Sequence, residues 1–184
     1  PASVTKSYLA AAALDRWAPQ HRFTTRLVSE ARPDAEGVLH GDLILDGGGE
    51  PALTTEDLWR LVQRLYQAGV REVSGRLLVS QWRFGPVACI TTDRCEARER
   101  TRHAYSALLS SAGVNYGSGC VNVAPAEAPG EPANVTGCDS QAAILAIDNR
   151  VVTRPDNSGT QISAERVTRE GRDVMLLSGQ ISTN

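Results

Sequence analysis

Two residues near the start of the chain, Ser3 and Lys6, have the types and the spacing for nucleophilic catalysis. Residues three apart on a helix lie on one face, so these two side chains can come within hydrogen-bonding distance. A serine hydroxyl is a weak nucleophile until a neighbouring base takes its proton, and a lysine is such a base only as a neutral amine. The pair therefore has the form of a Ser-x-x-Lys nucleophile motif at the beginning of a helix.

Lys6 is the only lysine among the 19 lysine and arginine residues of the chain. Arginine stays protonated at neutral pH, whereas a buried lysine can act as a base. The alternative is that so short a pattern arises by chance. Residues 9–14 are apolar on every side, which predicts a helix that is buried all round and therefore disfavours a charged amine. We expect Ser3 and Lys6 to be catalytic residues in this apolar setting.

The composition is that of a globular chain with no strong charge. The chain has 184 residues, of which 41% are hydrophobic, and a formal net charge of -2. This length allows one domain or two small ones with a hydrophobic core. The charge gives no reason to expect binding to nucleic acid or to an anionic membrane surface. No run approaches the ~20 apolar residues of a transmembrane span.

The four cysteines are Cys89, Cys95, Cys120 and Cys138. An even number permits two disulfides, in any of three connectivities. Their spacings match no common zinc site, and the three histidines are scattered, so we expect no bound metal. We favour a Cys89–Cys95 bond that closes a short loop and a Cys120–Cys138 bond between two strands, formed in an oxidising compartment. The alternative is four buried free thiols in a cytosolic protein.

The first 80 residues predict a helix followed by an α/β unit. The expected elements are a helix over 3–17, strands over 24–31 and 38–45, a helix from Thr54 or Thr55 to Gly69, and a strand over 73–80. The first two strands are expected to form a hairpin, and the later elements a strand-helix-strand unit. The glycine-rich residues 46–51 lack the spacing of a phosphate-binding loop, so we interpret them as a tight turn.

After residue 80 the pattern becomes polar and then β-rich. Residues 82–103 mix both signs of charge, which favours a solvated, salt-bridged surface over an anion site. From Cys120 onwards, short strands alternate with turn signals, as in an all-β module. The expected strands cover residues 120–124, 133–136, 143–147, 150–153, 161–168 and 173–178. The change from the α/β part to the β part is expected within residues 104–119.

The opening residues, Pro-Ala-Ser-Val-Thr-Lys and a helix rich in leucine and alanine, resemble the active-site helix of the serine acyltransferases that include penicillin-binding proteins and β-lactamases. Further segments, in the same order along the chain, resemble one branch of them, the D-alanyl-D-alanine carboxypeptidases/endopeptidases of the class C low-molecular-mass penicillin-binding proteins. These segments are 23–27, 41–45, 47–53, 57–65, 75–77, 83–84, 105–108, 121–123, 147–149 and 177–181. The resemblance covers essentially the whole chain.

This resemblance implies an α+β fold in which a catalytic domain is interrupted soon after its first helix. Residues 1–24 would begin a penicillin-binding-protein/β-lactamase-like α/β domain, residues 25–110 would form an inserted α/β unit, and residues 111–184 a β-rich insertion module. Ser3 would form an acyl-enzyme with D-Ala-D-Ala peptides of peptidoglycan or with β-lactams, and Lys6 would be its base. The family implies no cofactor, and a periplasmic or extracytoplasmic location in bacteria.

Two further catalytic motifs of the family follow the insertion, a Ser-x-Asn and a Lys-Thr-Gly. The chain has no second lysine, so Lys-Thr-Gly is absent. Ser182-Thr183-Asn184 spells Ser-x-Asn, but it directly follows 178–181, which belong to the insertion in the family, so we interpret it as a coincidence. We therefore expect the N-terminal part of a longer enzyme, weakly active or inactive alone. The alternatives are a non-catalytic module that binds or positions peptidoglycan, and a small Ser-x-x-Lys esterase or β-lactamase-like hydrolase.

Overall fold

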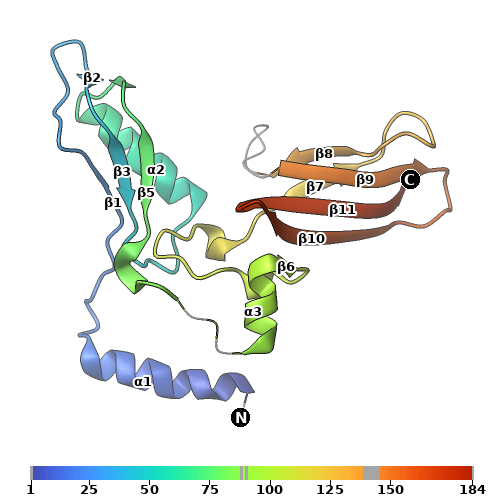
Figure 1. The fold of residues 1–184 in the computed structure, drawn as a ribbon, viewed down its shortest axis with the longest axis horizontal. Helices are drawn as coiled ribbons and strands as arrows, with labels where there is room; N and C mark the ends of the chain where they lie inside the picture. Colours follow the sequence, from blue (N-terminus) through green and yellow to red (C-terminus); the bar gives the residue numbers. More distant parts are fainter. Residues whose placement is uncertain (1, 88, 90, 139–145, 184) are drawn as a thin grey trace.

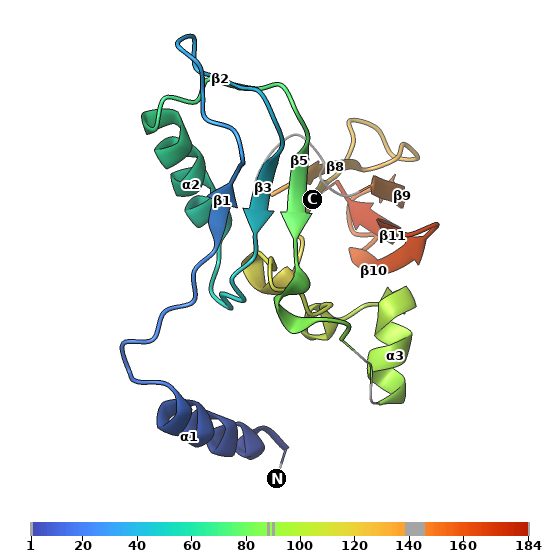
Figure 2. The same cartoon turned by 60° about the vertical axis from the view of Figure 1, so that its left-hand side comes forward.

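The computed structural model describes residues 2–87, 89, 91–138 and 146–183. They form an N-terminal helix, an α/β unit and a β-rich module joined through a short helical segment (Figure 1). Figure 2 shows the same arrangement after a turn, with the N-terminal helix at one end and the two sheets above it. The expectation of a mixed helix-and-strand fold is confirmed.

The chain begins with a 3-10 turn, η1 (Ala2–Thr5), which continues into helix α1 (Lys6–Arg16). The backbone N–H of Trp17 donates to the carbonyl of Ala13 at 2.8 Å and closes the last turn. No residue of α1 is buried, so the prediction of a helix buried all round is wrong for this chain. The physical reason is that α1 projects from the body of the molecule (Figures 1 and 2), with no sheet of the described residues packed around it.

Three rings hold the segment that leads from α1 to the first strand. The rings of Trp17 and His21 are stacked with their centroids 5.1 Å apart, and the ring of Phe23 is nearly perpendicular to both, in T-shaped contacts. Aromatic pairs in these geometries attract each other beyond their simple burial. This cluster therefore orders the chain between α1 and the α/β unit.

The α/β unit is a three-stranded sheet in the order β1-β3-β5, with one crossover helix. Strands β1 and β3 pair antiparallel as a hairpin, whereas β3 and β5 pair in parallel through helix α2, so the predicted hairpin and strand-helix-strand unit are confirmed. A second, parallel pair is formed by β2 and β4. The elements are β1 (Arg26–Val28), β2 (Val38–Leu39), β3 (Leu43–Asp46), α2 (Thr55–Gln67), β4 (Glu72–Val73) and β5 (Leu77–Ser80).

The predicted strand over 38–45 is divided into β2 and β3 at Gly41. The N–H of Gly41 donates to the carbonyl of Leu39 at 3.0 Å, a tight turn that redirects the chain from one strand pair to the other. Of the glycine-rich residues 46–51, which are predicted to form a tight turn, residues 47–50 are irregular and a turn is present only at residues 51–52. A side chain at Gly48 would place its Cβ 2.1 Å from the carbonyl oxygen of Thr24, so only glycine fits against that backbone.

Helix α2 begins with the capping arrangement that its sequence indicates. The Thr54 hydroxyl accepts a hydrogen bond from the N–H of Asp57, whose carboxylate accepts one from the N–H of Thr54. Both hydrogen bonds satisfy backbone N–H groups that the first turn of a helix leaves without a partner. The inner face of α2 packs through Leu65 on the buried Leu39 and Leu43, which form the core of the α/β unit.

Residues 82–103 contain more regular structure than their polar sequence indicated. They form η2 (Trp82–Phe84), helix α3 (Thr92–Glu99) and strand β6 (Arg100–Thr101). The Cys89–Cys95 disulfide joins the preceding loop to α3. Glu165 pairs with both Arg100 and Arg102, at 3.3 and 3.5 Å. The segment is salt-bridged, as predicted, but its acidic partner lies more than sixty residues away along the chain.

Short 3-10 turns, η3 (Ala104–Ser106) and η4 (Asn115–Gly117), lead into the β-rich module. The module contains a four-stranded sheet in the order β6-β10-β11-β9 and a two-stranded hairpin, β7-β8. In the larger sheet β10 and β11 are antiparallel, whereas β11 and β9 are parallel. The strands are β7 (Val121–Ala124), β8 (Asn134–Gly137), β9 (Ala146–Arg154), β10 (Gln161–Arg169) and β11 (Arg172–Ser182).

Strand β9 corrects one prediction. The predicted strands over 143–147 and 150–153 place Asp148 and Asn149 in a turn between them, but both residues lie within β9 and pair with β11. The side chain of Asn149 explains the difference, because its amide donates to the carbonyl of Ala133 at 2.7 Å and its oxygen accepts from the N–H of Val151 at 3.0 Å. Residues 143–145 of the predicted strand over 143–147 lie outside the described residues.

The core of the module lies between the larger sheet and the hairpin. Ala133, Val151 and Leu177 are buried together there. The Cys120–Cys138 disulfide closes the open end of the β7-β8 hairpin, where the N–H of Cys138 donates to the carbonyl of Cys120. Both favoured disulfides are therefore present, and the alternative of four free thiols is excluded.

Candidate active site

Ser3 and Lys6 face each other where the 3-10 turn becomes an α-helix. Ser3 lies in η1 and Lys6 is the first residue of α1, so the backbone turns once between them. The ammonium group of Lys6 donates a hydrogen bond to the Ser3 hydroxyl oxygen, with 3.3 Å between Nζ and Oγ. The structure therefore brings together the two residues that the sequence singled out.

The surroundings of this pair are exposed. Ser3 and Lys6 are both open to solvent, and so are the apolar side chains that follow them, with Tyr8 76% and Leu9 72% exposed. Burial would favour the neutral form of an amine, but these residues leave the amine of Lys6 in water. The geometry of a nucleophile beside a base is thus present, whereas the apolar environment expected around it is not.

The Ser-x-Asn sequence at residues 182–184 does not lie beside Ser3. Ser182 ends β11, where its N–H donates to the hydroxyl of Thr160 at 3.1 Å and the adjacent Thr183 N–H donates to the carbonyl of Arg154. The two chain ends lie well apart in both views of the ribbon (Figures 1 and 2). Asn184 lies outside the described residues. Ser182 and Thr183 thus hold the end of a strand, remote from Ser3.

Within the described part of the chain, no group of three or more histidine, cysteine or acidic side chains could hold a metal ion. The search for membrane spans among the same residues finds no helix with the length and apolar character required.

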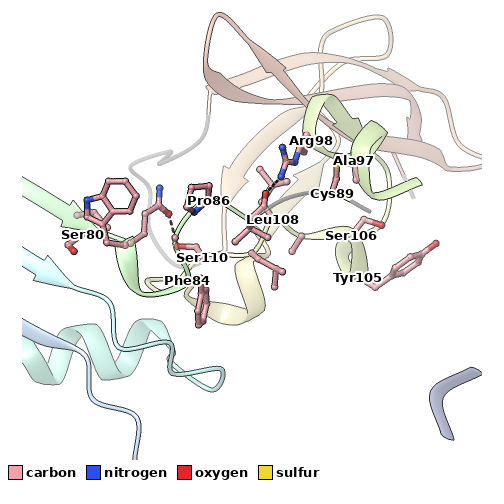
Figure 3. A pocket seen from close by; sticks show the side chains of 17 residues that line it. Ser80, Phe84, Pro86, Cys89, Ala97, Arg98, Tyr105, Ser106, Leu108 and Ser110 are labelled. Carbon is pink, nitrogen blue, oxygen red and sulfur yellow. Dashed lines mark hydrogen bonds between the residues drawn. The ribbon is translucent and has the colours of Figure 1, made fainter. Parts of the chain in front are cut away.

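A groove of about 1170 Å³ was not indicated by the sequence. Three parts of the chain bound it: the end of β5 together with η2, helix α3, and the η3 segment, by which we mean residues 104–110 (Figure 3). Hydrogen bonds fix two of its walls: Ser110 donates to the side-chain oxygen of Gln81 at 2.8 Å, and Arg98 donates to the carbonyl of Val87. Its apolar residues come mainly from two separate stretches, 79–87 and 105–109, which meet only in the folded chain. We call this cavity the η2–η3 groove.

Comparison with known proteins identifies the family. The model of the D-Ala-D-Ala carboxypeptidase 3 (S13) family matches residues 1–183. The chain belongs to this family. A D-alanyl-D-alanine carboxypeptidase of Actinomadura sp. (strain R39) is 32% identical over 187 residues, which cover 98% of this chain and 33% of that protein. The chain therefore spans about a third of the length of this curated relative.

Solved structures show the same fold. Penicillin-binding protein 4 (dacB) of Haemophilus influenzae matches with a TM-score of 0.71 and 21% identity, over all of this chain and 39% of that one. The structure of the H. influenzae protein in complex with a β-lactam matches with a TM-score of 0.64 and 20% identity, over all of this chain and 36% of that one. The predicted resemblance to the D-Ala-D-Ala carboxypeptidases is thus confirmed, and this S13 chain corresponds to part of such a protein.

Proposed function

We propose that these residues are the part of a serine-type D-Ala-D-Ala carboxypeptidase/endopeptidase that carries its nucleophile and base. The observation that supports this most directly is the 3.3 Å contact between Lys6 Nζ and Ser3 Oγ in a chain of the S13 family. The substrates are peptidoglycan stem peptides that end in D-Ala-D-Ala. β-Lactams acylate the same serine, because they present a reactive carbonyl to the same nucleophile.

The chemistry follows from the two side chains. Lys6, as a neutral amine, accepts the hydroxyl proton of Ser3 while Ser3 Oγ bonds to the carbonyl carbon of the penultimate D-Ala. The peptide C–N bond then breaks, and the amine of the departing D-alanine takes the proton from Lys6. Water then attacks the ester carbonyl carbon while Lys6 accepts a proton from it, the bond from that carbon to Ser3 Oγ breaks, Ser3 Oγ takes the proton back from Lys6, and the shortened peptide leaves with a free carboxyl group. In the structure Lys6 donates to Ser3, so the working state requires this hydrogen bond to reverse its direction.

The exposure of Lys6 indicates what the rest of the enzyme must provide. A neutral amine needs an apolar or positively charged setting, and α1 has no buried residue in this chain. The oxyanion and leaving group also need hydrogen-bond donors, which the Ser-x-Asn and Lys-Thr-Gly motifs carry in the family. We therefore infer that efficient acylation needs a polypeptide of the relatives' length, and that these 184 residues react slowly or not at all.

Two disulfides support an extracytoplasmic location. Cys89–Cys95 and Cys120–Cys138 are both formed, and such bonds persist in oxidising compartments. The proposed substrate, peptidoglycan, lies in the same place in bacteria. A periplasmic or other extracytoplasmic site of action therefore agrees with both the bonds and the chemistry.

A second candidate function is favoured by the contrast between α1 and the rest of the chain. The α/β unit and the β-rich module each have a buried core, whereas α1 has none. By themselves these residues would then be a folded module that positions peptidoglycan without reacting with it. This candidate predicts binding of peptidoglycan fragments that is unaffected by Ser3→Ala.

The deciding experiment is intact-mass spectrometry after incubation with a penicillin. We expect a polypeptide of the relatives' length to gain the mass of the drug and its Ser3→Ala variant to gain none. Lys6→Arg, which keeps the charge but cannot accept a proton at neutral pH, should slow acylation by about a hundredfold or more, as expected for the loss of a general base. An adduct that persists in Ser3→Ala would show that the nucleophile is another residue.

The 184-residue chain, tested in parallel, separates the remaining alternatives. No adduct on the folded chain would support the non-catalytic module for these residues alone. A full adduct that is then hydrolysed, or turnover of a simple ester, would support a small hydrolase that uses Ser3 and Lys6 without further motifs.

A further inference from the structure

Beside the face that packs on the sheet, helix α2 carries a line of large apolar side chains that stay exposed. Trp59, Val62 and Tyr66 are 63%, 53% and 55% exposed. Their spacings of three and four residues place them in one line along the helix, labelled α2 in Figure 1. Exposed apolar side chains that gather on one face, rather than lying singly, mark a site of interaction. We call this line the α2 ridge.

The two rings of the ridge have a spacing that matches a linear sugar chain. Trp59 and Tyr66 are seven residues apart, which separates them by ~10 Å along the helix axis. That separation is about the length of one disaccharide in a β-1,4-linked strand of amino sugars. Because one face of such a sugar ring presents mainly C–H groups, it packs on a flat aromatic ring. Two rings at this spacing therefore meet every second sugar of the strand.

Contacts at the C-terminal end of α2 hold the ring of Tyr66 in place. The guanidinium of Arg71 lies 3.7 Å from the ring centroid and donates to the backbone carbonyls of Tyr66 and Val70. A side chain that is already ordered loses less conformational entropy when it binds a ligand. Arg71 also places a positive charge at this end of the ridge, which is complementary to the free carboxylates of peptidoglycan stem peptides.

A third exposed ring lies next to a residue that is bound to the first residue of α2. The side-chain oxygen of Asn115 accepts from the N–H of Thr55 at 3.2 Å, and its amide donates to the Thr55 hydroxyl at 2.8 Å. The following residue, Tyr116, has a φ of 60°, in the left-handed region that residues with a Cβ rarely adopt, and is 80% exposed. The fold thus holds a strained backbone that presents this ring to solvent.

The polar neighbours of the ridge suit the hydroxyl and acetamido groups of amino sugars. Gln63 lies one helical turn after Trp59, and Gln67 directly follows Tyr66. Their amide groups both donate and accept hydrogen bonds. A line one side chain wide suits a linear strand better than a stable protein interface, which covers a broad patch on the order of 800 Å² per partner.

We propose that the α2 ridge binds the glycan strand of peptidoglycan, with Trp59 and Tyr66 each stacking on a sugar ring and Tyr116 providing a further ring. This inference rests on the proposed function, because it names the part of peptidoglycan that is held away from the stem peptide at Ser3. Attachment to the strand raises the local concentration of the stem peptides that the same strand carries.

Binding can be measured by calorimetric titration of the 184-residue chain with a soluble hexamer of β-1,4-linked N-acetylglucosamine. Trp59→Ala and Tyr66→Ala should each weaken binding by about tenfold, as expected for the loss of one anchoring ring. Trp59→Phe keeps a ring and should retain most of the affinity. The matched control is Trp82→Ala, which removes a tryptophan that is 78% exposed on η2 and should leave the affinity unchanged.

Two results of this titration would overturn the proposal: no binding of the hexamer, or equal affinities for the wild type and Trp59→Ala. Because Trp59 is 63% exposed, its replacement by alanine should leave the melting temperature nearly unchanged. If Trp59→Ala nevertheless fails to fold, the comparison of Tyr66→Ala with Trp82→Ala decides the question.

Hydroxyl-radical footprinting of Trp59 distinguishes a glycan from other occupants of the ridge. Without sugar, Trp59 should be oxidised at the same rate in the 184-residue chain and in a polypeptide of the relatives' length, and the hexamer should slow its oxidation in both. Protection in the longer polypeptide alone would mean that another part of the protein covers the ridge. Protection that grows with protein concentration would mean that a second copy covers it. Either result would make the proposal wrong.

Penicillin acylation of the longer polypeptide separates failure of this inference from failure of the proposed function. Acylation at Ser3 together with a ridge that does not bind the hexamer would leave the enzyme assignment standing and remove the glycan site. Hexamer binding that depends on Trp59, without acylation at Ser3, would support the ridge and contradict the enzyme assignment.

Discussion

Helices α1 and α2 have similar lengths but opposite relations to the rest of the chain. Helix α2 has one apolar face, packs it on the β1-β3-β5 sheet through Leu65, and starts with a complete capping box at Thr54. Helix α1 is apolar around most of its circumference and has no side-chain hydrogen bond at its cap. Neither helix has a fully buried residue, but α2 half-buries Leu58, Leu61 and Leu65, whereas every residue of α1 except Ala13 is exposed. The two helices therefore differ in packing: α2 lies against a neighbouring sheet, whereas α1 packs on no sheet of the described residues.

The difference shows how the amino-acid pattern of a helix predicts the number of its neighbours. A helix with one apolar face needs one packing surface, which a neighbouring strand-helix-strand unit provides. A helix that is apolar on every side needs surfaces all round, as in the centre of a large domain. Helix α1 has the second pattern, but the described residues provide no such surfaces around it.

The largest expected effect is a difference between matched leucine substitutions in the two helices. Leu65→Ala on α2 should lower the free energy of unfolding of this chain by about 2–3 kcal/mol, because it leaves a cavity beside Leu39 and Leu43. Leu9→Ala on α1 should change it by less than about 0.5 kcal/mol, since Leu9 is 72% exposed. Urea denaturation followed by circular dichroism measures both, and equal effects would contradict the contrast.

Leu9→Ala in a longer polypeptide tests whether α1 is exposed only in the 184-residue chain or also in a protein of the relatives' length. In a protein of the relatives' length we expect Leu9→Ala to cost about 2 kcal/mol, because α1 is then inside a core. Thermal unfolding of the matched pair of long polypeptides measures this cost. A cost still below about 0.5 kcal/mol would mean that α1 remains exposed in the complete protein.

Removing the cap of α2 should have a smaller effect. Thr54→Ala should lower the free energy of unfolding by about 1 kcal/mol, because the N–H of Asp57 loses its acceptor. Thr54→Ser keeps a hydroxyl at the same place and should retain most of the stability. If Thr54→Ser is as destabilising as Thr54→Ala in the same urea titration, the methyl group rather than the hydrogen bond is responsible.

The smallest expected effect is on the pH dependence of stability in acid. Hydrogen bonding from the Thr54 N–H, then from its hydroxyl, and the nearby Arg60 hold the pKa of Asp57 below its usual value of 3.8. A carboxylate with a lowered pKa stabilises the folded state above that value, and this contribution disappears as the pH falls through the lower, folded pKa. Asp57→Asn should therefore make stability less dependent on pH below about 4, measured as unfolding midpoints between pH 2 and 5. An unchanged slope would show that other carboxylates dominate.

Local patterns in the sequence predicted much of this fold. The Thr54 cap, the β1-β3 hairpin, the strand-helix-strand unit and both disulfides depend on residues close together in the chain, and all are present. The predictions from sequence were wrong where contacts between residues distant in the chain determine the secondary structure. Asn149 looked like a turn residue, but its side chain bonds to the Ala133 carbonyl and keeps β9 continuous.

Strand β6 and helix α3 were missed for the same reason. Their polar sequence has little apolar periodicity, and they are held by partners on β10, where Arg166 donates to the carbonyl of Ala97 and Thr168 donates to that of Arg98 at 3.0 Å. The η2–η3 groove has no sequence signal because its walls come from segments that meet only after folding.

The sequence by itself determined the Ser3–Lys6 pairing, because a single helical turn brings residues three apart together whatever surrounds them. It also determined the family, through ordered motifs along the whole chain. Only the tertiary structure decided that α1 is exposed and that Trp82, Tyr105 and Leu109 share one groove. Burial is a property of neighbouring surfaces rather than of a side chain, so it follows from how the elements pack and from which part of the polypeptide is there to pack.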